Sequence, residues 1–105
     1  GPTTSVHALR VLVDPEASHG VNEEVAFSFS DGTTVGLRLR NHIAVPTDGQ
    51  EAEHVLSLDL GTWAGICSGR TSVASAIDDG SITVTGERYR IDKVLACFDH
   101  PSFQL

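Results

Sequence analysis

Apolar and polar residues alternate regularly between residues 25 and 39. Val25, Phe27 and Phe29 are separated by small or polar residues, and the same alternation returns over residues 35–39. Side chains that alternate in this way point to opposite faces of a β-strand, so each run predicts a strand with one buried face. Asp31-Gly32 lies between the two runs, and an Asp-Gly pair in this position predicts a hairpin with a two-residue turn.

Three more strands complete the predicted sheet, over residues 43–45, 53–60 and 81–85. Asn41-His42 predicts a tight turn before the first of them, because Asn tolerates the left-handed backbone conformation. We expect Pro46 to end that strand, and a polar loop to follow it.

Three segments have the spacing of amphipathic helices: residues 4–12, 62–77 and 87–98. Thr4 or Ser5 is expected to cap the first helix. Ser68-Gly69 interrupts the second segment, which predicts two short helices in its place. The third segment has the clearest apolar stripe, and Pro101 is expected to end it.

The order of these elements predicts an α+β fold. A helix is followed by four strands, two short helices, a fifth strand and a last helix. This order indicates a five-stranded, mainly antiparallel sheet with one face covered by helices and the other open to solvent. The 105 residues are enough for one domain. We expect residues 3–105 to form it and Gly1-Pro2 to be the remnant of a purification tag.

Composition and charge exclude several kinds of partner. Apolar residues make up 40% of the chain and charged residues 20%, and the net charge is −7 with a single lysine. Nucleic acids and anionic membranes are bound mainly through Lys and Arg, so neither is an expected partner. No apolar run approaches the roughly 20 residues that cross a bilayer, and no secretory signal is recognisable. These features predict a soluble, cytoplasmic domain.

The residue types that carry bond chemistry form no recognisable site. We expect the five histidines, which lack the spacing of metal ligands, on the surface or in turns: His7, His19, His42, His54 and His100. Cys67 and Cys97 lie among apolar helical residues and are interpreted as buried free thiols, while a single disulfide stays open. No nucleophile elbow, phosphate loop or dinucleotide motif occurs. The sequence therefore predicts no catalytic residue, no metal and no cofactor.

Two charged segments have simple structural interpretations. Arg38 and Arg40 lie on the predicted polar face, where they could bind an anion, but we expect Glu24 or Asp59 on neighbouring strands to neutralise them. Asp78-Asp79-Gly80 lacks the spacing of calcium ligands and predicts a solvated turn.

Large apolar residues gather in the predicted helices and the C-terminal tail. Trp63, the only tryptophan, shares a short helix with Ile66, and Phe98 and Phe103 follow near the end of the chain. Two interpretations stay open for them. They fill the core under the sheet, or they line a groove between helices and sheet that holds an alkyl chain.

Five segments follow one another in an order that is typical of a known family. They are residues 14–17 (Asp-Pro-x-x-Ala), 29–32 and 37–43 (a hairpin and a Leu-x-Leu-Arg-Asn turn), 76–86 (compare Gly-x-Leu-x-Val-x-Gly) and 98–103 (Asp-x-Pro-x-Phe). By these segments the chain resembles the sterol-carrier-protein-2-like (SCP2-like) domain, and most closely the C-terminal domain of bacterial alkyl sulfatases. The resemblance covers nearly the whole chain.

This resemblance implies a non-catalytic binding module, because the family's sulfatase chemistry resides in a separate domain with a His-x-His-x-Asp-His zinc motif. It implies a pocket between sheet and helices for a lipid, a sterol or an alkyl chain, either in a carrier or in the substrate-binding part of an alkyl sulfatase. The expected apolar walls are Trp63, Ile66, Ile77, Val94, Leu95, Phe98 and Phe103. A homodimer and a catalytic domain before Thr3 both stay open. The alternative function is a protein-interaction or dimerisation module without a ligand.

Overall fold

Within residues 1–104, which the computed structural model describes, five strands form one sheet in the order β3-β2-β1-β4-β5. The strands are β1 (Asn22–Phe29), β2 (Thr34–Arg40), β3 (Ile43–Thr47), β4 (Val55–Leu58) and β5 (Thr83–Thr85). Neighbouring strands are antiparallel, except that β1 and β4 run parallel. The mainly antiparallel sheet predicted from the alternation is confirmed.

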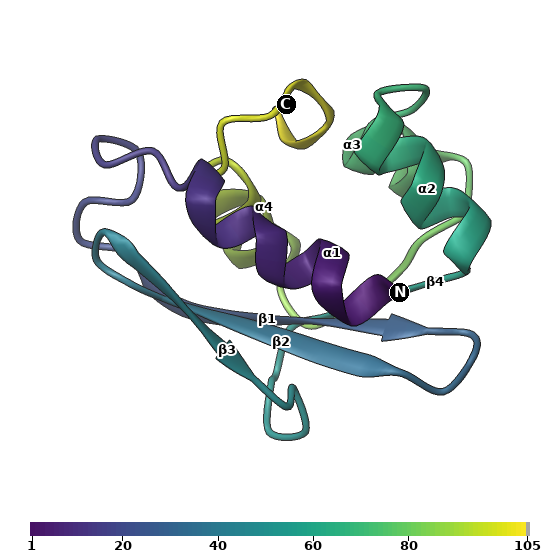
Figure 1. Cartoon of the computed structure of the whole chain (residues 1–105), viewed down its shortest axis with the longest axis horizontal. Coiled ribbons are helices and arrows are strands. Elements are labelled where there is room, and N and C mark those ends of the chain that lie inside the picture. The colour runs from purple at the N-terminus through teal and green to yellow at the C-terminus, as the bar shows by residue number, and fades with distance from the viewer. Residues whose placement is uncertain (105) are drawn as a thin grey trace.

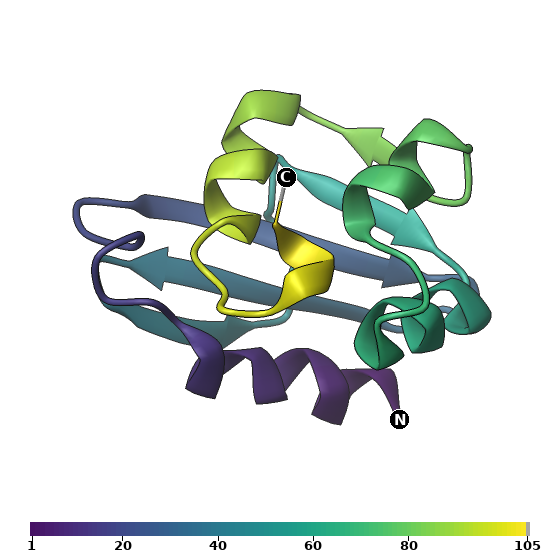
Figure 2. The same ribbon diagram turned by 90° about the horizontal axis from the view of Figure 1, so that it is seen from above.

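The helices lie together on one face of this sheet (Figure 1). They are α1 (Pro2–Ala8), α2 (Leu60–Ser68), α3 (Val73–Asp78) and α4 (Arg88–Leu95), with two short 3-10 helices, η1 (Leu9–Leu12) and η2 (Pro101–Phe103). Figure 2 shows α1 along one side of the helical layer, α4 on the other side, and η2 near its middle. The predicted order of helices and strands, with the helices on one face, is confirmed.

One apolar core fills the space between the sheet and the helices. Its largest fully buried side chains come from both layers: Phe27, Phe98, Leu37, Leu39, Leu56, Ile66, Ile91 and Leu95. Each such side chain contributes roughly 1.5–3 kcal/mol when it leaves water. The core explains why the alternating residues of β1 and β2 face the helices.

The first hairpin turn is longer than predicted. The backbone N–H of Phe29 donates to the carbonyl of Thr33 at 2.8 Å, and the N–H of Gly32 donates to the carbonyl of Phe29 at 3.0 Å. Residues 30–32 therefore form a three-residue loop, in which Gly32 takes a positive φ of 93°. The second turn is confirmed, because Asn41 has the expected left-handed conformation, with φ 57°.

Pro46 does not end the third strand, contrary to the prediction. It lies inside β3 opposite Leu37, and the strand continues to Thr47. Proline is tolerated here because β3 is the edge of the sheet, where an N–H that points outward needs no partner strand.

The other predicted boundaries shift for local reasons. The fourth strand ends at Leu58 because the Asp59 carboxylate caps α2, accepting the N–H of Thr62 at 2.7 Å. The last helix ends at Leu95, earlier than predicted, because the chain then forms a bridge between Val13 and Phe98.

The first helix also begins earlier than predicted and without a side-chain cap. It starts at Pro2, whose fixed φ suits the first turn of a helix, and it tightens into η1 at Leu9. The break at Ser68-Gly69 is confirmed, since Gly69 ends α2 with φ 81°.

The face of the sheet away from the helices is partly covered, although it was expected to be open. Ala26 is fully buried there, because Gly49 in the loop after β3 lies against it. The loop is held by the Thr47 hydroxyl, which donates to Glu24 Oε2 at 2.6 Å and accepts the N–H of Gly49 at 3.1 Å. A side chain on Gly36 would leave no room for this loop.

Candidate apolar groove

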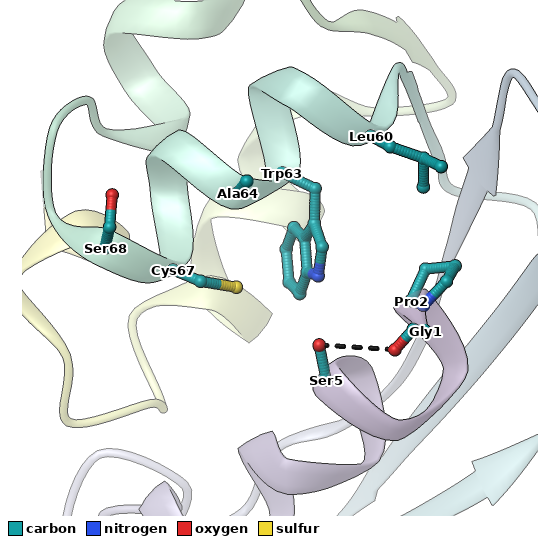
Figure 3. A pocket seen from close by; sticks show the side chains of 8 residues that line it. All are labelled: Gly1, Pro2, Ser5, Leu60, Trp63, Ala64, Cys67 and Ser68. Atoms are coloured by element: carbon teal, nitrogen blue, oxygen red, sulfur yellow. Dashed lines mark hydrogen bonds between the residues drawn. The ribbon is translucent and has the colours of Figure 1, made fainter.

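A hollow of about 560 Å³ lies between α1 and α2 (Figure 3). Its lining is mostly apolar or small: Gly1, Pro2, Ser5, Leu60, Trp63, Ala64, Cys67 and Ser68. A volume of this size lies within the roughly 300–1,000 Å³ typical of small-molecule sites. The hollow is therefore large enough to hold part of an alkyl chain.

A second hollow of about 260 Å³ continues along the same helix toward the C-terminal turn. Its lining residues are Ser5, Ala8, Leu9, Leu12, Cys67, His100 and Phe103. Ser5 and Cys67 line both hollows, so the two adjoin. We call their union the interhelix groove, with α1 and η1 as one wall and α2 and η2 as the other.

Trp63 projects from α2 into the layer between this groove and the sheet. Its ring centroid lies 5.2 Å from that of Phe27, 5.9 Å from that of Phe29 and 6.3 Å from that of Phe103. The side chain is 4% exposed, yet no hydrogen-bond partner lies near its indole Nε1 among the described residues. Trp63 therefore joins the groove to the core and carries an unpaired donor.

The predicted wall residues fall into three positions. Trp63 and Phe103 line the groove itself. Four others are buried in the core beneath it: Ile66, Val94, Leu95 and Phe98. Ile77 is half-buried on α3 and packs against the edge of the core. The Phe103 ring links two of these positions, since it lies 6.3 Å from Trp63 and 6.0 Å from Phe98.

Sequence reasoning missed the wall that α1 and η1 provide. Ser5, Ala8, Leu9 and Leu12 face the groove, whereas the sequence predicted only a helix in this region. The apolar spacing of Leu9 and Leu12 was a signal for a buried helix face. It carried no information about the helix that this face would meet.

One of the two thiols lies where it was not expected. Cys97 is fully buried as predicted, but Cys67 is exposed at the groove, and both are free. Desolvation raises the pKa of Cys67, and it raises that of Cys97, where the charge of Asp14 acts in the same direction. A thiol with a raised pKa is a poor nucleophile at neutral pH, so neither position is built for thiolate chemistry.

His54 is buried, contrary to the expectation of a surface or turn histidine. It is 7% exposed, and its Nδ1 accepts the N–H of Glu87 at 3.2 Å. Its Nε2 lies 4.0 Å from Glu23 Oε2, and Glu23 also forms an ion pair with Arg90. His54 therefore connects the start of β4 to β1 and α4, which is a structural role.

The predicted carboxylates form no ion pair with Arg38 or Arg40 among the described residues. Arg38 lies opposite Glu24 in the register, but its side chain donates to Asn22 Oδ1 at 2.9 Å. Glu24 is occupied by the Thr47 hydroxyl, and Asp59 caps a helix. Arg40 is exposed.

The predicted acidic turn is confirmed for Asp79-Gly80, while Asp78 is the last residue of α3. Asp79 is exposed and accepts the N–H of Ser81 at 2.9 Å, and hydrogen bonding from the Ser81 side chain and from this N–H lowers the pKa of Asp79. Among residues 1–104 the structure contains no group of three or more His, Cys, Asp or Glu side chains that could hold a metal ion. In the same residues no helix is both long and apolar enough to cross a membrane.

The mixed sheet with helices on one face defines a sterol-carrier-protein-2-like fold. A palmitated SCP2-like protein from Aedes aegypti superimposes with a TM-score of 0.67 at 15% identity, over 87% of each chain. Apo sterol carrier protein 2 from Yarrowia lipolytica superimposes with a TM-score of 0.57 at 15% identity, over 82% of this chain and 77% of that chain.

The family is shown by a match along nearly the entire sequence. The family model for the alkyl sulfatase C-terminal domain matches residues 3–104, and the chain belongs to this family. A stereoselective inverting sec-alkylsulfatase from Pseudomonas sp. superimposes with a TM-score of 0.80 at 19% identity. The superposition covers 99% of this chain but 17% of the alkylsulfatase chain. A search of curated protein sequences finds no match. The resemblance predicted from the sequence is thus confirmed.

Proposed function

We propose that this domain binds the apolar chain of a lipid or alkyl compound in the interhelix groove and performs no catalysis itself. The observation that carries the proposal is the apolar hollow of about 560 Å³ between α1 and α2, with Trp63 in its wall. The palmitated SCP2-like relative supports an acyl or alkyl chain as the ligand. Membership of the alkyl sulfatase family supports a role as the substrate-chain-binding part of a longer protein that includes a catalytic domain.

The expected affinity is modest. Burying about ten methylenes contributes roughly 8 kcal/mol, and association costs at least about 4 kcal/mol. The remaining roughly 4 kcal/mol corresponds to a Kd near 1 mM. A groove that is already formed and one polar contact would bring the Kd toward about 1 μM.

The predicted wall residues have two roles in this proposal: some contact the ligand and others support them from the core. Trp63 and Phe103 contact the ligand, since both line the groove. Ile66, Val94, Leu95 and Phe98 support these two rings from the core, and Ile77 closes the edge of the core.

Titration of the fluorescence of Trp63 tests the proposal. We expect a saturable change with decanol below its solubility limit, because a bound chain would change the surroundings of the single indole. Ala64→Leu should weaken binding, since Ala64 is exposed in the groove and a larger side chain fills it. Ser75→Leu is the matched control, because Ser75 is exposed on α3 outside the groove. A flat trace from the folded protein contradicts the proposal.

A second candidate function, protein interaction, is favoured by the edge strand β3. Ile43 is 64% exposed and Val45 is 40% exposed, and alternation places both on the same face. An uncovered edge strand can pair with another chain. Sedimentation would then show a mass that rises with concentration, and Ile43→Lys would abolish the rise.

A further inference from the structure

The indole N–H of Trp63 has an unusual position for a buried donor. Trp63 is 4% exposed, its Nε1 is shielded from solvent, and no acceptor lies within hydrogen-bond distance among residues 1–104. A buried donor without a partner loses the hydrogen bonds that water provides in the unfolded chain, so buried Trp N–H groups usually have partners. An acceptor supplied from outside the chain would remove this deficit.

The indole lies beside the groove that the proposed function assigns to a ligand. Figure 3 shows it reaching from α2 toward α1, with its nitrogen on the side of Ser5 and Pro2. The Ser5 hydroxyl donates to the carbonyl of Gly1 at 3.3 Å and makes no bond to the indole. Trp63 lines the hollow, so an acceptor held between the two helices would lie beside the indole, and a small shift of α1 or of the ring would bring it to the shielded Nε1.

The charge of the groove indicates which kind of acceptor fits. Of the described residues that line the two hollows, none is Asp, Glu, Lys or Arg. His100 lines the second hollow, and its Nδ1 accepts the N–H of Ser102 at 3.1 Å. A charged head group would lose its hydration in such a groove without gaining a side-chain counter-ion. An uncharged acceptor oxygen needs only one hydrogen-bond donor, and the indole N–H of Trp63 is such a donor.

We propose that the groove selects an uncharged alkyl compound that carries a hydrogen-bond-accepting oxygen, and that Trp63 Nε1–H donates to this oxygen. Ketones, alcohols and esters belong to this class, whereas an alkyl sulfate or a carboxylate would have to keep its charged head group outside the groove. The inference rests on the proposed function, since it places the ligand in the same groove. It adds the polar contact that determines specificity.

A matched pair of ligands isolates the hydrogen bond. 2-Decanone and 2-methyl-1-decene have nearly the same shape, but one has a carbonyl oxygen where the other has a methylene group. The single Trp gives one indole N–H signal in a ¹H–¹⁵N spectrum. We expect 2-decanone to move the indole proton downfield, and 2-methyl-1-decene to shift the surrounding signals while the indole proton keeps its unbonded position.

Variants then measure the size of the effect. The ratio of the two dissociation constants should favour the ketone about fivefold more in the wild type than in Trp63→Phe, as expected for one neutral hydrogen bond. Phe103→Leu is the control, because Phe103 also lines the groove but carries no donor. It should weaken both ligands and leave their ratio unchanged. If Trp63→Phe does not fold, the indole signal of the wild type decides the question.

The outcomes separate the two proposals. If both ligands bind and move the indole proton equally, the hydrogen bond is refuted while the proposed groove stands. Decyl sulfate is the third ligand, because it carries an alkyl chain of the same kind with a charged head group. Tighter binding of decyl sulfate than of 2-decanone would overturn the selection for uncharged ligands. If none of the three binds, the proposed function fails and this inference fails with it.

Discussion

Gly36→Ala should destabilise the fold strongly, although Gly36 lies on the face of the sheet that carries no helices. A Cβ at this position would lie 2.0 Å from Thr47 Oγ1 and 2.9 Å from the backbone N and Cα of Gly49. The Thr47 side chain cannot rotate away freely, because its hydroxyl bonds both Glu24 and the N–H of Gly49. The loop backbone would have to move as well.

The magnitude follows from these contacts. Forcing extra volume into a packed site costs about 1–3 kcal/mol, and each hydrogen bond lost adds about 1 kcal/mol. We therefore expect the free energy of unfolding to fall by about 3 kcal/mol. With a urea m-value of about 1–3 kcal/mol/M, the midpoint should fall by roughly 1–3 M.

Urea unfolding monitored by the fluorescence of Trp63 measures this change. Gly61→Ala is the matched control, because a Cβ there meets nothing closer than Asp59 Oδ1 at 3.5 Å. Gly61 lies in α2, where Ala is the better helix former, so this variant should be as stable as the wild type or slightly more stable. A Gly36→Ala midpoint within about 0.3 M of the wild type would refute the close packing of the loop on the sheet.

Three further predictions concern the C-terminal turn, acid stability and the thiols. Ser102→Ala should cost about 1 kcal/mol in thermal or urea unfolding, because the buried hydroxyl donates to the carbonyl of Ile66 at 2.7 Å, and without it that carbonyl keeps only the longer bond from the N–H of Gly69 at 3.2 Å. The backbone N–H of Thr62 holds the pKa of Asp59 below its ordinary value. The ionised Asp59 carboxylate therefore stabilises the fold fully at a pH above that ordinary value, and this stabilisation is lost as the pH falls toward the lowered pKa. Urea midpoints across this acid range should therefore fall less steeply in Asp59→Asn. A thiol reagent should modify Cys67 and spare the buried Cys97 in the native protein. The modification of Cys67 should become faster as the pH rises toward its raised pKa, and slower when a ligand occupies the groove. Equal labelling of both thiols would contradict the structure.

Local patterns in the sequence predicted most of the fold. The alternation around Val25 and the helical stripe of α4 each reflect one buried face, and burial of that face is what builds the sheet and its cover. The predicted ends of strands and helices were wrong where a residue or strand outside the segment determines them. Asp59 reads as the end of an alternating strand, but its carboxylate starts a helix. Pro46 reads as a strand breaker, but its place at the sheet edge makes it harmless.

The burial of His54 could have been predicted from the local sequence. It continues the alternation of Leu56 and Leu58, so the pattern already placed it on the buried face of β4. The polarity of histidine argued for the surface. The N–H of Glu87 and the carboxylate of Glu23 make burial possible, and neither contact can be read from the neighbouring sequence.

The groove shows where prediction from local sequence ends. Trp63 and Ile66 lie three residues apart in α2, both nearly shielded from solvent, yet one lines the groove and the other is wholly within the core. Both residues are apolar and both lie on the same face of the helix, so no periodic pattern distinguishes a residue that lines the groove from one in the core. The difference arises from elements at both ends of the chain, because α1 leaves a hollow beside Trp63 while η2 packs onto α2 through Ser102 and Ile66. Apolar residues along a helix therefore predict burial, and the distant segment that completes the burial, or stops short of it, decides where a ligand can bind.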